Sequence, residues 1–226
     1  MKFNYSLIAG AVALACSAGA AQASVTLLSD GFEAAGSPTN PPWQSFSSNA
    51  GGIVQSSVDP YAGSYSLELN NTSLGAADFV KAQQIGSGVV NTGDSITIAG
   101  EVRGSLGVSG DVQVVAFGEA CAPPGGCGTN GSTFVKSLAG TLNANSTVWS
   151  PFSYTFTING TPVGGLTVQL SAVTGAVSGA FAHGFFDNVT ITDTTASAVP
   201  VPASIWLLGS ALVGGLGVFR RKTIKA

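Results

Sequence analysis

The chain has 226 residues, of which only 8% are charged, and a formal net charge of −3. Its basic residues gather at the two ends: between Lys2 and Arg220 lie three basic and all eleven acidic residues, a net charge of −8. Such a surface repels phosphate backbones and excludes nucleic acid as a partner, and a hydrophobic fraction of 45% excludes a disordered acidic chain.

Residues 1–23 have the pattern of a secretory signal peptide. Lys2 provides the positive charge, residues 6–15 are apolar, and Ala-Gln-Ala at 21–23 forms a small-residue cleavage site. We therefore expect export through the Sec machinery and cleavage by signal peptidase after the last of these alanines. The alternative is a lipoprotein signal cut before Cys16, whose preceding Ala-Leu-Ala is a displaced version of the usual motif.

Residues 24–193 show the two-residue periodicity of β-strands and almost no helical periodicity. In residues 95–102, Ile96, Ile98 and Val102 share one face, and polar side chains share the other. The same alternation occurs at 64–69, 111–117, 152–158, 165–172 and 185–192. Turns rich in Gly, Pro and Asn separate these runs. Short half-buried strands joined by turns predict an all-β domain, an antiparallel β-sandwich.

Acidic residues stand at both ends of this domain. Asp30 and Glu33 lie in SDGFEAAG. Asp187 lies in FFDNVTIT, where it has the parity of Val189 and Ile191, which predicts a place on the apolar face. A buried ionised carboxylate needs a cation or several hydrogen bonds. Hard oxygen ligands suit Ca²⁺; the alternative is that Asp187 accepts backbone N–H bonds.

Two cysteines, Cys121 and Cys127, bracket a short stretch of Pro and Gly. In an exported protein this spacing favours a disulfide that closes a small loop. Zinc is the alternative, although the sequence offers no second pair of ligands and His183 is its only histidine.

The sequence carries no motif of a known class of hydrolase. G-x-S-x-G and H-E-x-x-H are absent, and His183 precedes a predicted strand, which favours a loop or edge position over a general base. Eleven acidic residues offer many carboxylate pairs, so no pair is specific. We therefore predict a non-catalytic protein; the alternative is a secreted glycan hydrolase that uses Asp or Glu catalysis.

Four short motifs resemble, in their order along the chain, those of jelly-roll carbohydrate-binding modules: G-F-E at 31–33, G-S-Y-S-L at 63–67, Trp149 before a strand and F-D-N-V at 186–189. The resemblance implies a jelly-roll fold in which a structural calcium ion joins the first and last strands. It assigns the calcium ligands to Glu33 and Asp187, with Asp30 as a further candidate.

Sugar binding needs aromatic platforms on an exposed face or loop. The candidates are Trp43, in PPWQSF, and Tyr61. We interpret Trp149 as a core residue. An exopolysaccharide is the partner that this interpretation implies.

We interpret residues 194–198 as a polar linker that leads to a membrane segment. Residues 205–219 are apolar without interruption, and a helix counted from Val199 would be about 31 Å long, close to the thickness of a bilayer core. The tail 220–226 begins with three basic residues that would stay in the cytoplasm, Arg220, Arg221 and Lys222.

This end of the chain resembles the PEP-CTERM sorting signal, which exosortases of Gram-negative bacteria recognise and process. Its motif at 199–204 consists of Val199, Pro200, Val201, Pro202, Ala203 and Ser204. The commonest form has glutamate where this chain has Val201. The resemblance implies an inner-membrane intermediate, an exosortase as partner, and delivery to the cell surface or extracellular matrix for a structural or adhesive role. The alternative is a permanent single-span anchor, which would keep the basic tail that sorting removes.

Overall fold

The computed structural model describes residues 24–36, 38, 40–48, 52–119, 129–143, 145–160 and 164–195. The predicted signal peptide 1–23, the cysteines Cys121 and Cys127 and the predicted sorting signal 199–226 lie outside these residues. Within the described part, we find no helix with the length and apolar character needed to span a bilayer.

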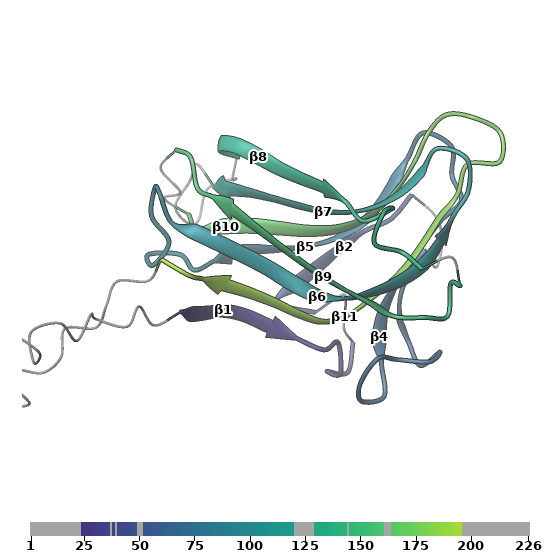
Figure 1. The fold of residues 1–226 in the computed structure, drawn as a ribbon, viewed down its shortest axis with the longest axis horizontal. Coiled ribbons are helices and arrows are strands. Elements are labelled where there is room, and N and C mark those ends of the chain that lie inside the picture. The colour runs from purple at the N-terminus through teal and green to yellow at the C-terminus, as the bar shows by residue number, and fades with distance from the viewer. Residues whose placement is uncertain are drawn as a thin grey trace, which may run out of the picture. The chain divides into compact units, whose positions relative to one another are not determined.

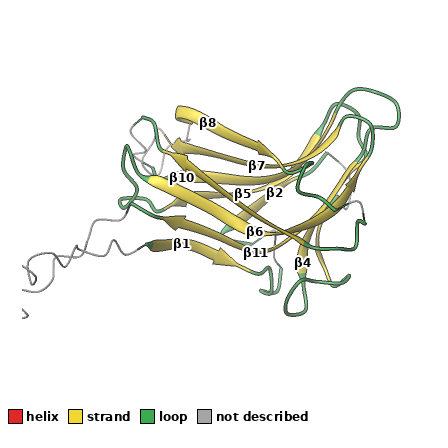
Figure 2. Ribbon diagram, viewed as in Figure 1, coloured by secondary structure: helices red, strands yellow, loops and turns green. Residues whose placement is uncertain are grey.

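The described residues form eleven strands and no helix (Figures 1 and 2). The strands are β1 (Val25–Asp30), β2 (Trp43–Phe46), β3 (Ile53–Ser56), β4 (Ser66–Asn71), β5 (Ala77–Ile85), β6 (Ser95–Leu106), β7 (Gly110–Glu119), β8 (Thr129–Ser137), β9 (Ser150–Thr157), β10 (Leu166–Thr174) and β11 (Ala182–Asp193). The predicted all-β class is therefore confirmed.

The strands form two antiparallel sheets. Sheet A has the order β3-β4-β11-β6-β9, and sheet B has the order β2-β5-β10-β7-β8. One edge of β11 serves two partners, because residues 182–186 pair with β4 and residues 189–193 pair with β1, while β6 occupies its other edge. β11 therefore pairs with three strands of sheet A, namely β1, β4 and β6.

Apolar side chains of both sheets form one core. Ile96 and Ile98 of β6 and Leu170 of β10 are completely buried, as their alternation with polar residues predicts. Burial of one such side chain stabilises a fold by roughly 1.5–3 kcal/mol. The core therefore provides the rigid support on which the polar outer faces of the sheets are held.

A β-bulge in β11 changes the side on which Asp187 lies. The register against β6 shifts between Asp187 and Thr190, and Asn188 has a φ of 48°, in the left-handed region. Phe186 contacts Phe152 in the core, whereas Asp187 lies on the opposite side of sheet A. The prediction that Asp187 shares the apolar face is wrong, because a bulge breaks the two-residue alternation on which it depended.

Candidate ligand-binding site

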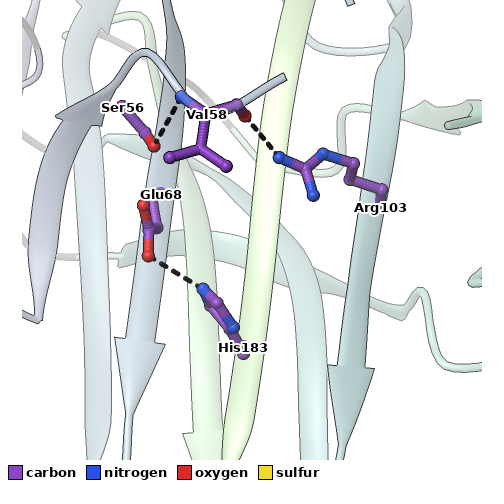
Figure 3. A network of polar contacts seen from close by, with 5 residues as sticks. All are labelled: Ser56, Val58, Glu68, Arg103 and His183. Carbon is purple, nitrogen blue, oxygen red and sulfur yellow. Dashed lines mark hydrogen bonds and ion pairs between the residues drawn. The ribbon is translucent and has the colours of Figure 1, made fainter. Parts of the chain in front are cut away.

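The connection between β3 and β4, here called the 57–65 loop, lies against the outer face of sheet A. The Val58 carbonyl accepts a hydrogen bond from the Arg103 guanidinium on β6 (Figure 3). The Asp59 carbonyl accepts one from the indole N–H of Trp149, at 3.1 Å. The loop thus joins residues from distant parts of the sequence into one surface.

Two carboxylates hold this loop by its backbone. Asp187 Oδ2 accepts the N–H groups of Tyr61 at 3.0 Å and Ala62 at 3.1 Å. Glu33 accepts the N–H groups of Ser64 and Tyr65, each at 3.0 Å to Oε1. Hydrogen bonds to an ionised acceptor are roughly twice as strong as neutral ones. The F-E and D-N-V motifs therefore converge on one loop and fix its position over sheet A.

Gly63 allows the loop to pass this close to Glu33. It has a φ of +66°, and a Cβ built on it would lie 2.4 Å from Glu33 Oε1. A side chain at this position would strain the backbone and displace the carboxylate. The G-S-Y-S-L motif therefore begins with glycine because only a residue without a side chain lets the loop hydrogen-bond to Glu33 at this distance.

Two aromatic side chains stand together at the rim of the loop. Tyr61 is 50% exposed, and its ring meets that of Trp149 edge to face with centroids 6.0 Å apart. Trp149 is half-buried, so its interpretation as a core residue is wrong; its indole N–H is held by the loop carbonyl of Asp59. Such a pair offers apolar faces beside polar edges, a combination that suits amphipathic ligands.

Arg103 lies beneath this pair. Its side chain is only 4% exposed, and its guanidinium lies 3.7 Å from the Phe185 ring centroid and 5.2 Å from that of Trp149. Its Nε has no hydrogen-bond partner among the described residues. Burial lowers the pKa of Arg103, while the negative charges of Asp59 and Glu68 oppose that shift. The cation therefore supports the aromatic pair from below rather than projecting into solvent.

His183 and Glu68 form a hydrogen-bonded pair on the same face as Arg103. The distance from His183 Nε2 to Glu68 Oε1 is 2.9 Å (Figure 3). His183 lies within β11, between β4 and β6, so the prediction of a loop or edge position is wrong. The pair adds hydrogen-bonding groups to the outer face beside the aromatic residues.

One further acidic residue, Glu101, lies beside Asp187 at the base of the 57–65 loop. The pKa of Glu101 is raised chiefly by burial, with a smaller contribution from the charge of Asp187, and a hydrogen bond with Tyr61 opposes the rise. The pKa of Asp187 is also raised chiefly by burial; N–H bonds from the backbone oppose the rise, and the charge of Glu33 adds to it. Because Asp187 is completely buried, it supports the loop and is not positioned to contact a substrate.

A shallow pocket of about 280 Å³ opens at the end of β6. It lies where β6 meets the connection between β8 and β9, and its lining includes Ser105, Leu142 and Asn143. Ser105 is in register with His183 on the neighbouring strand. The pocket therefore extends the polar surface beyond His183. Ser105 contributes a hydroxyl group to its lining, and Asn143 contributes an amide group.

The structure does not place Trp43 or Asp30 at this surface. Trp43 is completely buried, and its indole N–H donates to Asp30 Oδ2 at 2.8 Å. Asp30 Oδ1 accepts the N–H of Phe32, whose ring packs near Trp43. The prediction that Trp43 is an exposed platform is wrong, because it occupies the inward position of β2 while Gln44 takes the outward one.

The outer face of sheet B offers a weaker aromatic surface. Phe46 and Phe79 stack on each other with centroids 5.0 Å apart, and the Lys81 ammonium lies 4.6 Å from the Phe46 centroid. The Phe46 ring, which is 41% exposed, therefore contacts two neighbours on this face. This face therefore provides a control surface for tests of ligand binding.

Sequence reasoning missed Arg103, Glu68 and Phe185 as members of the site. One signal was available: Arg103 is one of only three basic residues in the domain, and it directly follows the alternating run at residues 95–102. A buried guanidinium needs aromatic or acidic neighbours. The neighbours themselves depend on the register of three strands, which the sequence does not provide.

No family model matches the chain, and no curated protein matches it. Among solved structures, it is similar to the Stig cyclase Fisc from Fischerella sp. TAU, with a TM-score of 0.52 and 12% identity over 77% of this chain and 100% of that one. It is also similar to the CBM22-1 xylan-binding domain of Paenibacillus barcinonensis Xyn10C, with a TM-score of 0.47 and 17% identity over 79% of this chain and 100% of that one. Other carbohydrate-binding modules recur among the similar structures. At 12% identity, the likeness to the cyclase shows a shared fold alone.

Proposed function

We propose that this protein is an exported, non-catalytic module that binds a polysaccharide on the outer face of sheet A. The observation that carries the proposal is the Tyr61–Trp149 pair, held in place by the 57–65 loop and supported by Arg103. Sugar rings present C–H groups that pack on aromatic faces and hydroxyls that need donors and acceptors nearby. The His183–Glu68 pair and the polar pocket at Ser105 would supply the second requirement.

The charge of the domain favours a neutral glycan. Its net charge of −8 opposes the approach of an acidic polymer. Near the aromatic pair, the negative charges of Asp59 and Glu68 act on the buried Arg103 cation, and Glu101 is hydrogen-bonded to Tyr61. Neutral polysaccharides such as xylan and β-glucan are therefore the first ligands to test, with alginate as the acidic comparison.

Replacement of the aromatic pair tests this proposal. We expect Tyr61→Ala and Trp149→Ala each to weaken retention on a neutral polysaccharide by roughly tenfold or more, because central aromatic contacts dominate such interfaces. Affinity electrophoresis of the purified protein in gels containing each glycan measures the effect. Phe46→Ala on sheet B is the matched control and should leave retention unchanged. Loss of binding in the control, with binding kept by the two variants, would move the site to the other sheet.

The predicted calcium ion would bind at Glu33 and Asp187. Among the described residues no three His, Cys, Asp or Glu side chains come together as a metal site. However, a carboxylate offers about four lone-pair positions, so the N–H bonds to these two residues leave room for a cation. A Cβ on Gly31 would lie 3.4 Å from Asn188 Oδ1 and 3.6 Å from Asp187 Oδ1, which shows two side-chain oxygens directed at one glycine.

Calcium should therefore raise the melting temperature, since a cation would relieve the repulsion between Glu33 and Asp187. We expect a chelator to lower the melting temperature measured by calorimetry, and added Ca²⁺ to restore it. The double variant Glu33→Gln, Asp187→Asn should lose this response, whereas Asp94→Asn, in a distant turn, should keep it. An identical melting temperature with chelator and with Ca²⁺ would remove the calcium site.

The termini would deliver the module to its place of action. The signal peptide 1–23 would direct export, and the sorting signal 199–226 would pass through the inner membrane to an exosortase. If an exosortase removes this signal, the mature protein will lack the cluster Arg220-Arg221-Lys222. Intact-mass spectrometry of the protein from its host measures this directly. A mass that includes the basic tail would instead indicate a permanent anchor.

A further inference from the structure

Three loops meet at one end of the domain. They are residues 72–76 between β4 and β5, 107–109 between β6 and β7, and 175–181 between β10 and β11. We call them together the three-loop tip. The opposite end holds the start of β1 and the end of β11, where Val25 pairs with Asp193 (Figure 1). The tip is therefore the part of the domain that points away from both of its connections to the rest of the chain.

The three-loop tip presents large apolar side chains to solvent. Each loop contributes at least one: Leu74, Val108, Val177 and Phe181. Val108 is the most exposed of them, at 65%, although the transfer of a valine side chain out of water is favourable. Four such side chains at one end of an exported domain form an exposed apolar patch of the kind that marks an interaction surface.

The tip lacks charge, and its loops pair their backbone groups with one another. None of the fifteen residues of the three loops is charged. The Gly75 N–H donates to the Gly175 carbonyl, the Gly175 N–H donates to the Ser109 carbonyl, and the Gly107 N–H donates to the Phe181 carbonyl. Hydrogen-bonded backbone groups enter an apolar medium at a much lower free-energy cost than unpaired ones do.

The negative charge of the domain indicates which kind of partner can approach the three-loop tip. Asp111, which is partly exposed, stands near the start of β7, a sheet B strand that leaves the tip. A second copy docked tip to tip would bring together two such carboxylates and two domains of net charge −8. A surface of anionic lipids would be repelled for the same reason. An electrically neutral apolar medium would not repel the acidic domain.

We propose that the three-loop tip inserts into the interface of a bilayer made of neutral, zwitterionic lipids. Leu74, Val108, Val177 and Phe181 would enter the boundary between headgroups and acyl chains, to the depth typical of interfacial protein segments. The Tyr61–Trp149 pair, which lies beyond the opposite end of β4 from the tip, would remain in water. The domain would thus touch a membrane through the end opposite to Ser24 and Thr195.

Hydrogen exchange of the full chain, measured by mass spectrometry with and without phosphatidylcholine vesicles, tests this inference. It reports on each loop separately, so binding of other segments to the vesicles does not obscure the result. We expect slower exchange in 72–76, 107–109 and 175–181, and no change in the turn 86–94 at the other end of the domain. Phosphatidylglycerol in the vesicles should reduce the protection, because the domain is acidic.

Matched variants complete the test. Leu74→Ser combined with Val108→Ser should abolish the vesicle-dependent protection of the tip, whereas Val89→Ser, at a residue 50% exposed in the other turn, should retain it. Exchange in β6 confirms that each variant is folded. Unchanged exchange of the tip on neutral vesicles would overturn the inference. Protection that appears without vesicles as the protein concentration rises would also overturn it, in favour of a second copy as the occupant.

Discussion

Replacement of Gly104 by alanine should lower the free energy of unfolding by about 3 kcal/mol, at the upper end of the usual cost of overpacking. Gly104 of β6 faces Gly184 of β11, the central strand pair of sheet A. A Cβ on Gly104 would lie 2.1 Å from the His183 carbonyl oxygen and 3.0 Å from the Gly184 Cα. Both neighbours are backbone atoms, so only a shift of a whole strand relieves the clash.

Urea denaturation followed by tryptophan fluorescence measures this effect. Gly140→Ala is the matched control, because a Cβ there meets no atom within 4 Å, and it should change the midpoint little. Equal midpoints for the two variants would show that β6 and β11 do not approach as closely as the structure indicates. A large loss in Gly104→Ala alone supports the strand pairing that positions Arg103 and His183.

Replacement of Asp187 by alanine should cost about 3 kcal/mol and also weaken glycan binding. The change removes the acceptor for three backbone N–H groups, those of Tyr61, Ala62 and Asn188. Each hydrogen bond to a charged group contributes roughly 1.5–3 kcal/mol, and the total stays below the sum because these exposed residues can bond to water instead. Since the 57–65 loop carries Tyr61, its release should also lower retention on the polysaccharide. Asp187→Asn keeps one oxygen and should fall between the wild type and the alanine variant in both measurements.

The stability of the domain should also depend on pH through Asp187. Because its folded-state pKa is raised above the ordinary value of 3.8, the unfolded chain ionises first as the pH rises. The contribution of this group to the free energy of unfolding therefore falls between pH 3.8 and the raised pKa, and stays constant above it. Asp187→Asn should remove this decline from a pH series of urea midpoints. A wild-type series parallel to that of the variant would contradict the raised pKa.

Strand positions were predictable wherever apolar and polar residues alternate. The faces expected for residues 95–102 and 165–172 agree with the burial of Ile98 and Leu170. Strands such as β2 and β3 were not predicted, because four residues are too few to establish a period. The order in which the strands pair could not be predicted from the sequence either, because β1 and β4 both pair with β11, which lies far from them along the chain.

The site was predictable only in fragments. Tyr61 is exposed as expected. Glu33 and Asp187 both accept hydrogen bonds from the 57–65 loop, a contact that the sequence did not indicate. The positions of Trp43 and Trp149 are the reverse of those expected, because residues near turns carry no clear period. A tryptophan in a loop looks the same in the sequence whether the chain turns it inward or outward.

Heteronuclear NMR of the ¹⁵N-labelled protein, titrated with a soluble xylan oligosaccharide and then with a β-glucan oligosaccharide, locates the glycan-binding surface residue by residue. We expect the indole N–H signal of Trp149 and the amide signals of Tyr61 and Ala62 to shift, while the indole signal of Trp43 stays in place. Shifts confined to sheet B, around Phe46 and Phe79, or no shift with any neutral glycan, would contradict this prediction.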